Sequence, residues 1–178
     1  MNNKLKDFLS TSIFFLAVVL ISFLVVKFVA QRTEVIGSSM MDTLEDGDNL
    51  ILDKISYKFS DPERFDIVVF PYREDTSKKY IKRIIGLPGE TVRIDADGKI
   101  YINGEELYES YGREVIQNPG LASEEITLKY DEYFVLGDNR NNSEDSRFAD
   151  VGNIDRSEII GKVWIRIWPL GKFGSVDK

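Results

Sequence analysis

The chain has 178 residues, a formal net charge of −7 at pH 7, and neither cysteine nor histidine. These absences exclude His-assisted serine nucleophiles, cysteine nucleophiles, disulfides and thiolate or imidazole zinc sites. A hydrolytic site in this chain therefore needs Lys, Asp, Glu or Tyr as its proton acceptor, and the sequence predicts no metal and no cofactor. The acidic balance, without a clustered cationic run, argues against a nucleic-acid partner.

A membrane anchor is predicted at the N-terminus. Residues 8–26 form 19 uncharged positions rich in Phe, Ile, Leu and Val, which as a helix would reach roughly 28 Å, close to the thickness of a bilayer core. The alternative is a cleaved secretory signal, but that needs a shorter apolar stretch and a small-x-small cleavage site, and residues 27–30 do not supply one. We therefore expect a cytoplasmic N-terminus over 1–7, an anchor over 8–30 and an extracytoplasmic domain over 31–178.

The rest of the chain has the pattern of an antiparallel β domain. No long 3.6-residue periodicity follows the anchor, and short apolar or alternating runs are separated by turn residues instead. Asp97-Gly98 between two such runs is a strong hairpin signal. The fold expected is mostly β, with a small β insertion at about 95–130 and one N-terminal transmembrane helix. The predicted strands cover residues 49–52, 66–70, 80–85, 91–94, 99–102, 132–136 and 160–168.

Without imidazole, a serine nucleophile needs a lysine that can lose its proton. In the predicted strand 80–85, Tyr80, Lys82 and Ile84 share one face, so Lys82 has bulky apolar neighbours. An ordinary lysine is only about 0.1% neutral near pH 7.4, and burial that lowers its pKa to about 8 raises this fraction to some 20%. Taken alone, the segment also fits an edge-strand lysine that keeps its charge in water.

Two further segments complete the pattern. Gly37-Ser38-Ser39-Met40-Met41 follows the anchor directly and places two hydroxyls beside a flexible glycine. Residues 137–147 form eleven consecutive polar, charged or glycine positions after an apolar strand, which is more than a turn requires and indicates a hydrogen-bonded support. Each segment alone is compatible with a linker or a solvated loop.

In this order, behind one membrane helix, the three segments resemble bacterial type I signal peptidases, the Ser/Lys endopeptidases that release exported proteins. Residues 39–44 (SMMDTL) are similar to the family's S-M-x-P-T-L segment, and 82–89 (KRIIGLPG) to its K-R-x-x-G-x-P-G segment. Residues 137–147 (GDNRNNSEDSR) are similar to its G-D-N-R-x-N-S-x-D-S-R segment. The resemblance covers nearly the whole chain, and a short chain with one anchor is similar to the forms found in Gram-positive bacteria.

The resemblance implies a role for each matching residue. Ser39 would be the nucleophile, with its backbone N–H in the oxyanion hole, and Lys82 would be the general base. Ser143 would hydrogen-bond to the Lys82 amine. The remaining supporting residues would be Asn142, the ion pair Asp145 and Arg147, and the structural group Asp138, Asn139 and Arg140.

Two positions depart from the family pattern. Many relatives carry a serine hydroxyl two positions before the nucleophile, where this chain has Gly37, so we expect an oxyanion hole built mainly from backbone. Asp42 stands where the family usually has proline. A carboxylate near Lys82 would raise the pKa of the amine and oppose catalysis, so we expect Asp42 to point away and to cap or hydrogen-bond its turn.

The resemblance also implies the substrate and the location. Secretory preproteins with small residues before the cut, and membrane lipid, are the expected partners of a single-pass cell-membrane protein. One alternative is a self-cleaving or specialised protease of the same wider group. Another is a catalytically silent, membrane-tethered domain that binds extracytoplasmic peptides. The apolar candidates for the substrate-binding wall are Val35, Ile36, Met40, Leu44, Tyr80 and Ile81.

Overall fold

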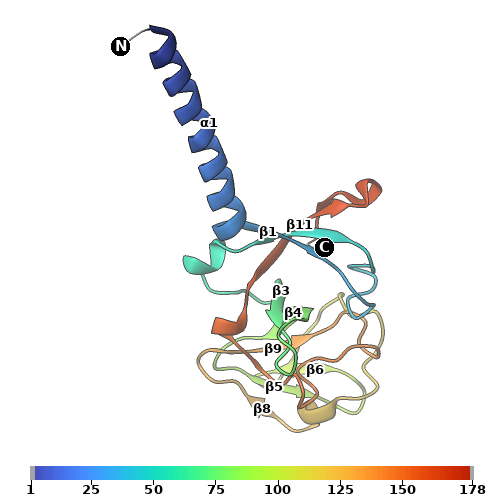
Figure 1. Ribbon diagram of the computed structural model, residues 1–178. Helices are drawn as coiled ribbons and strands as arrows, with labels where there is room; N and C mark the ends of the chain where they lie inside the picture. The colour runs from blue at the N-terminus through green and yellow to red at the C-terminus, as the bar shows by residue number, and fades with distance from the viewer. Residues whose placement is uncertain (1–2, 177–178) are drawn as a thin grey trace.

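The computed structural model describes residues 3–176 as one long helix standing on a β body (Figure 1). Helix α1 (Asn3–Phe28) is followed at once by β1 (Ala30–Glu34). Residues 6–24 of α1 are apolar enough to cross a membrane and are not buried against the rest of the chain. An apolar helix whose residues 6–24 stay exposed is typical of a membrane anchor.

A large antiparallel sheet forms most of the body. Its strands are ordered β1-β2-β11-β3-β4-β9-β10, and β12 pairs with β11. Helix α1 is thus tied to the sheet through its outermost strand. The bounds are β2 (Asn49–Asp53), β3 (Ile67–Pro71), β4 (Lys79–Gly86), β9 (Glu132–Leu136), β10 (Ile154–Asp155), β11 (Gly161–Trp168) and β12 (Gly174–Ser175).

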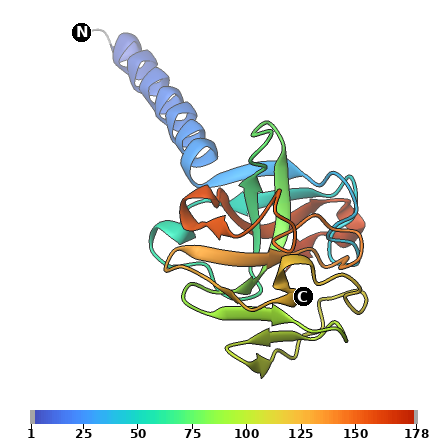
Figure 2. The same cartoon turned by 90° about the horizontal axis from the view of Figure 1, so that it is seen from below.

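A smaller antiparallel sheet lies at the end of the body far from α1 in both views (Figures 1 and 2). Its order is β7-β6-β5-β8, with bounds β5 (Thr91–Ile94), β6 (Ile100–Ile102), β7 (Glu105–Glu106) and β8 (Ile126–Thr127). Ile94 pairs with Ile100 across the predicted Asp97-Gly98 turn. Short 3-10 turns, η1 to η4, occupy Ser56–Lys58, Gly120–Ser123, Arg156–Glu158 and Leu170–Lys172.

The mostly antiparallel β fold with one N-terminal apolar helix agrees with the expectation from the sequence. Each predicted strand is present within one or two residues of its expected bounds. The pattern did not predict β1 or the two-residue strands β7, β8, β10 and β12. These strands are too short or too polar to show an alternating apolar pattern, and they exist because a neighbouring strand supplies their hydrogen bonds.

Strand β4 crosses the centre of the large sheet and positions the site. Its residues 81–86 are all buried. Strand β3 pairs with β4 along residues 79–83, whereas β9 pairs with it only from Arg83 onward. The first half of β4 therefore has one edge free of sheet pairing among the described strands. Lys82 lies at the point where this free edge ends.

Candidate active site

The loop carrying Ser39 is a tight turn fixed by backbone hydrogen bonds. Met41 N–H donates to the Ser38 carbonyl at 3.1 Å, and Leu44 N–H donates to the Met40 carbonyl at 2.7 Å. Gly37 enters the turn with a φ of 93°, a conformation that L-residues rarely adopt. A hydroxyl-bearing residue at position 37 would therefore strain the turn, which gives the departure noted in the sequence a backbone reason.

The Lys82 amine meets the Ser39 hydroxyl directly, with Nζ and Oγ 2.8 Å apart. Lys82 is only 3% exposed. Burial lowers the pKa of this amine from its ordinary value to about 8, although nearby carboxylates, Asp145 first, oppose the shift. A serine hydroxyl in contact with an amine that is partly neutral near pH 7 is the arrangement of an activated nucleophile.

The 137–147 loop holds the carbonyl side of the Ser39 turn. Asn139 N–H donates to the Ser39 carbonyl at 3.0 Å, and Asn139 Nδ2 donates to the Ser38 carbonyl at 3.0 Å. Asn142 Nδ2 donates to Ser38 Oγ at 2.9 Å. Among the described residues the Ser39 N–H has no acceptor, so this donor is left available beside its own hydroxyl.

A buried ion pair supports that loop from behind. Arg147 Nε lies 2.8 Å from Asp145 Oδ1, and both side chains are at most 2% exposed. Asp145 Oδ2 also accepts from the Gly137 N–H at 3.1 Å, and Arg147 Nη2 donates to the Arg140 carbonyl at 2.5 Å. Both ends of the loop are thus fixed by one pair of charges.

Ser143 is placed at the site but does not make the expected contact. Its hydroxyl is buried and has no hydrogen-bond partner among the described residues, so the expected bond to the Lys82 amine is absent. A Cβ added at Gly137 would overlap Ser143 Oγ and come within 2.5 Å of the Ser39 carbonyl oxygen. Gly137 therefore lets Ser143 and the Ser39 turn pack closely, and the hydroxyl of Ser143 points elsewhere.

A second buried ion pair, Arg83–Asp138, ties β4 to the loop. Arg83 Nε and Nη2 lie 2.9 and 2.7 Å from the two Asp138 oxygens. The Thr43 hydroxyl donates to Asp138 Oδ2 at 2.5 Å, so the carboxylate also holds the far end of the Ser39 turn. Arg83 was not a candidate from the sequence, because alternation places it on the strand face opposite Lys82. Its partner lies 55 residues away.

Arg140 forms a largely buried ion pair with Glu109. Its Nη1 lies 2.8 Å from Glu109 Oε1, and both side chains are under 10% exposed. Its Nε donates to the Gly137 carbonyl at 3.1 Å. The three residues 138–140 thus each fix a different neighbour of the site, in line with the structural role inferred for them.

Asp42 points away from Lys82, as expected, but it does not cap the turn. Its carboxylate lies 3.8 Å from Arg113 Nε, and it is not among the carboxylates with the largest effect on the pKa of Lys82. No hydrogen bond from this side chain to the turn is present among the described residues. Its backbone has a φ of 76°. Proline cannot adopt that angle, so the family's proline would not fit the backbone that this chain has at position 42.

A large groove of about 1060 Å³ opens over the Ser39–Lys82 pair. It runs between the β1 side of the Ser39 turn and the free edge of β4, and loop residues 141–144 close one side. Leu44 is fully buried in the core and is not among the lining residues, so its expected contact with substrate is not supported. The other apolar wall candidates all line the groove: Val35, Ile36, Met40, Tyr80 and Ile81.

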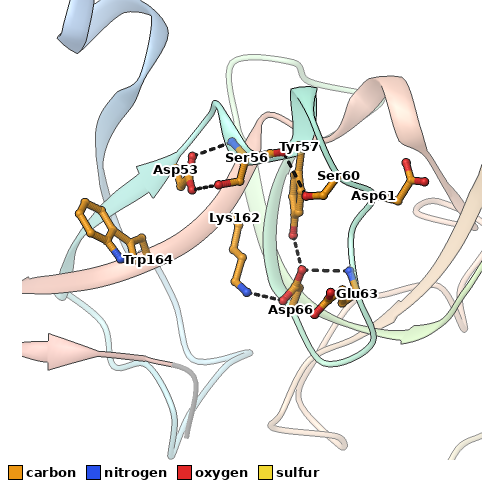
Figure 3. Close-up of a pocket in the computed structure, with 9 residues that line it drawn as sticks. All are labelled: Asp53, Ser56, Tyr57, Ser60, Asp61, Glu63, Asp66, Lys162 and Trp164. Atoms are coloured by element: carbon orange, nitrogen blue, oxygen red, sulfur yellow. Dashed lines mark hydrogen bonds and ion pairs between the residues drawn. The ribbon is translucent and has the colours of Figure 1, made fainter.

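A second cavity, of about 250 Å³, lies between η1, the start of β3 and β11 (Figure 3). Several of its polar side chains are paired: the Tyr57 hydroxyl donates to Asp66 at 2.7 Å, Lys162 lies 2.6 Å from Asp66, and the Ser56 hydroxyl donates to Asp53. Neither Ser39 nor Lys82 lines it. These contacts link η1 and β3 to β11 and account for the polar lining.

Comparison with known proteins identifies the family. The family model described as signal peptidase, peptidase S26, matches residues 7–168. Probable signal peptidase I-2 of Synechocystis is 41% identical over 152 residues, covering 83% of this chain and 67% of the relative. Signal peptidase I of Leptolyngbya laminosa is 42% identical over 159 residues, covering 84% and 74%. That of Bacillus caldolyticus is 40% identical over 157 residues, covering 82% and 84%. The chain therefore belongs to the peptidase S26 family of signal peptidases, which are serine endopeptidases.

Proposed function

We propose that Ser39 is the nucleophile and Lys82 the general base of a membrane-bound peptidase that removes signal peptides from exported preproteins. The observation that carries this assignment is the 2.8 Å contact between Ser39 Oγ and the amine of a lysine residue that is only 3% exposed. Burial supplies the neutral amine, and the contact supplies the route for the proton.

The reaction follows from these two groups. Neutral Lys82 takes the hydroxyl proton as Ser39 Oγ attacks the scissile carbonyl carbon. The ammonium then returns this proton to the leaving amine of the mature protein, which leaves an ester on Ser39. Lys82 next removes a proton from a water that attacks the ester carbon, and the released Ser39 oxygen recovers it.

The negative charge on the carbonyl oxygen needs a donor in place before the attack. The Ser39 N–H is suited to this role because Asn139 holds the carbonyls of Ser38 and Ser39 in place. The N–H itself has no acceptor among the described residues. The unpaired Ser143 hydroxyl can turn about its Cα–Cβ bond. We propose that this hydroxyl accepts a hydrogen bond from the Lys82 ammonium that forms during the attack. The ammonium needs such an acceptor, and the resting site does not provide it.

Substrate binding is assigned to the groove. An extended peptide would lie between the Ser39 segment and the unpaired edge of β4, where strand-like hydrogen bonds are available. Small side chains before the cut would face Val35, Ile36, Met40, Tyr80 and Ile81. Residues 1–7 would lie in the cytoplasm, 8–30 would span the membrane, and 31–178, with the insertion at about 95–130, would lie outside. The anchor would confine enzyme and precursor to the same thin layer and raise their effective concentration.

Cleavage of a precursor with an Ala-x-Ala site tests the assignment. The full chain in detergent should cleave it in trans, and Ser39→Ala and Lys82→Ala should each lose at least about 1000-fold in kcat/KM. Ser38→Ala, one residue away, is the matched control for the loss of a hydroxyl and should lose far less than Ser39→Ala. Cleavage that survives Lys82→Ala would refute the proposed base, and precursor binding without cleavage by the unmodified protein would favour the silent module.

A further inference from the structure

A tyrosine and a glutamate close the groove beside Lys82. The Tyr80 hydroxyl donates to Glu144 Oε2 at 2.8 Å, which joins β4 to the loop 64 residues later in the chain. Both residues line the groove. Glu144 lies between Ser143 and the buried Asp145, in the loop that supports the site.

The bond fixes an aromatic ring against the Lys82 amine. Lys82 Nζ lies 5.0 Å from the centre of the Tyr80 ring. On its other side the ring stacks on Tyr72, with centres 4.8 Å apart and planes 16° from parallel. Tyr72 in turn donates to Glu74 at 3.0 Å. The ring that covers the amine is thus held by a stack and by one hydrogen bond.

Glu144 also acts on the amine through its charge. The charged groups with the largest effect on the pKa of Lys82 are three carboxylates, from Asp145, Glu144 and Asp138, and one guanidinium, from Arg147. Asp145 is paired with Arg147 at 2.8 Å and Asp138 is also paired with an arginine. No ion pair to Glu144 is present among the described residues. Among the described residues, no ion pair offsets the charge of Glu144 in the way that arginines offset those of Asp145 and Asp138.

We propose that Glu144 is a positioning residue for the reaction: its hydrogen bond fixes the Tyr80 ring over Lys82, and its unpaired charge sets the pH range in which the amine serves as base. This inference rests on the proposed roles of Ser39 and Lys82. It separates two effects of one side chain, since the hydrogen bond needs only an acceptor oxygen whereas the electrostatic effect needs the charge.

Glu144→Gln removes the charge and keeps an acceptor for Tyr80. A nearby negative charge favours the ammonium form, so its loss lowers the pKa of Lys82. The acidic limb of kcat/KM, expected near pH 8, should move to lower pH by about 0.5 unit, and the plateau at high pH should fall less than in Glu144→Ala, which also loses the acceptor. Burial and the Glu144 bond raise the pKa of Tyr80 above its ordinary value, so its hydroxyl remains a donor across this range.

Two other variants isolate the hydrogen bond. Tyr80→Phe keeps the ring and the Glu144 charge but loses the hydrogen bond. The plateau of kcat/KM should therefore fall several-fold. The midpoint of the acidic limb should stay within about 0.2 pH unit, because the charge is unchanged. Glu144→Ala should show both the acid shift and the lower plateau. Glu74→Gln is the matched control, since it removes the equivalent partner of Tyr72 and should change neither quantity.

The outcomes distinguish this inference from the proposed function. An active protein whose midpoint does not move in Glu144→Gln, or whose plateau is unchanged in both Tyr80→Phe and Glu144→Ala, would overturn the role of Glu144. Absence of any cleavage that depends on Ser39 and Lys82 in the unmodified protein would instead overturn the proposed function. Equal melting temperatures of the variants would show that a lower plateau does not reflect unfolding.

Discussion

At the scale of single residues, the site depends on a lysine that is costly to bury. The folded protein lowers the pKa of Lys82 to about 8, whereas the unfolded chain leaves it near 10.4. Between these values the unfolded state binds more protons, so this group makes stability rise with pH from about 8 to about 10.4. Below pH 8 the folded state carries the full cost, which corresponds to about 3 kcal/mol.

Replacing this amine should therefore exchange activity for stability. We expect Lys82→Met to be inactive but more stable than the unmodified protein at pH 7, by up to about 3 kcal/mol, or on the order of 6 °C in Tm. The gain should shrink as the pH rises and vanish above pH ~10.4. Thermal unfolding in detergent at pH 7 and pH 10 measures both. Lys79→Met, on the exposed start of β4, is the control, and a similar gain there would contradict the explanation.

Gly137 is a second position where a single atom matters. An added Cβ would meet Ser143 and the Ser39 carbonyl oxygen, which is backbone and cannot move aside cheaply. Gly137→Ala should displace the nucleophile and lower kcat/KM by about 100-fold. Gly171→Ala, where nothing lies within 4 Å of the added atom, should leave activity unchanged. Wild-type activity in Gly137→Ala would show that the turn is not held against residue 143 as described.

At the scale of elements, the site is assembled where three chain segments meet. The Ser39 turn follows β1, Lys82 lies on β4, and the supporting loop follows β9. Two buried arginine–carboxylate pairs fix the loop: Arg83–Asp138 holds it to β4, and Asp145–Arg147 holds it to itself. Removing one partner of such a pair leaves an uncompensated buried charge, which costs about 3–5 kcal/mol. The precision of the Ser39–Lys82 contact thus depends on these supports.

The Ser39 turn itself requires a left-handed residue at position 42. Asp42→Pro cannot adopt a φ of 76° and should lower both Tm and kcat/KM, the latter more than tenfold by an order-of-magnitude estimate. Asp42→Gly should keep activity and gain about 1 kcal/mol by relieving the left-handed strain. Asp42→Asn tests the charge, since asparagine tolerates this conformation. Because the contact with Arg113 is exposed, its loss in Asp42→Asn should be nearly neutral. Full activity in Asp42→Pro would contradict the left-handed backbone at position 42.

At the scale of the whole molecule, the anchor and the β body are nearly independent. Residues 6–24 are not buried against the body, whereas the β body has its own apolar cores, which extend over both sheets. The backbone link between them is short, since β1 begins at Ala30, directly after α1. Lys54 N–H donates to the Val29 carbonyl in this link. We therefore expect the body to fold without the helix, which would serve to place the body at the membrane.

Deleting residues 1–28 should separate these two roles. The shortened protein should retain its Tm within about 2 °C and should cleave a soluble peptide with kcat/KM within about threefold of the full chain. Cleavage of a precursor held in vesicles should fall at least tenfold, because the effective concentration in the membrane layer is lost. Peptide and vesicle assays on the same preparation measure the ratio. An equal loss in both assays would show that α1 supports the fold of the body.

Much of this organisation could be predicted from the sequence because it depends on local chemistry. An uncharged run as long as a bilayer is thick, short apolar strands between turn residues, and a Ser, a Lys and a polar loop in one order are each visible within about ten or twenty residues. The Asp145–Arg147 pair was implied only by the resemblance to the family, although its partners are two positions apart. The pattern of the family then linked these local features into one site.

The tertiary structure decided what depends on distant partners and on burial. Arg83 finds Asp138 and Tyr80 finds Glu144 across 55 and 64 residues, and neither pairing leaves a periodic or spacing signal. Leu44 is in the core and Ser143 has no partner among the described residues, because packing around them, and not their neighbours in sequence, determines what they contact. The pKa of Lys82 has the same origin: the sequence names the amine, but only the surrounding strands and loops remove its water.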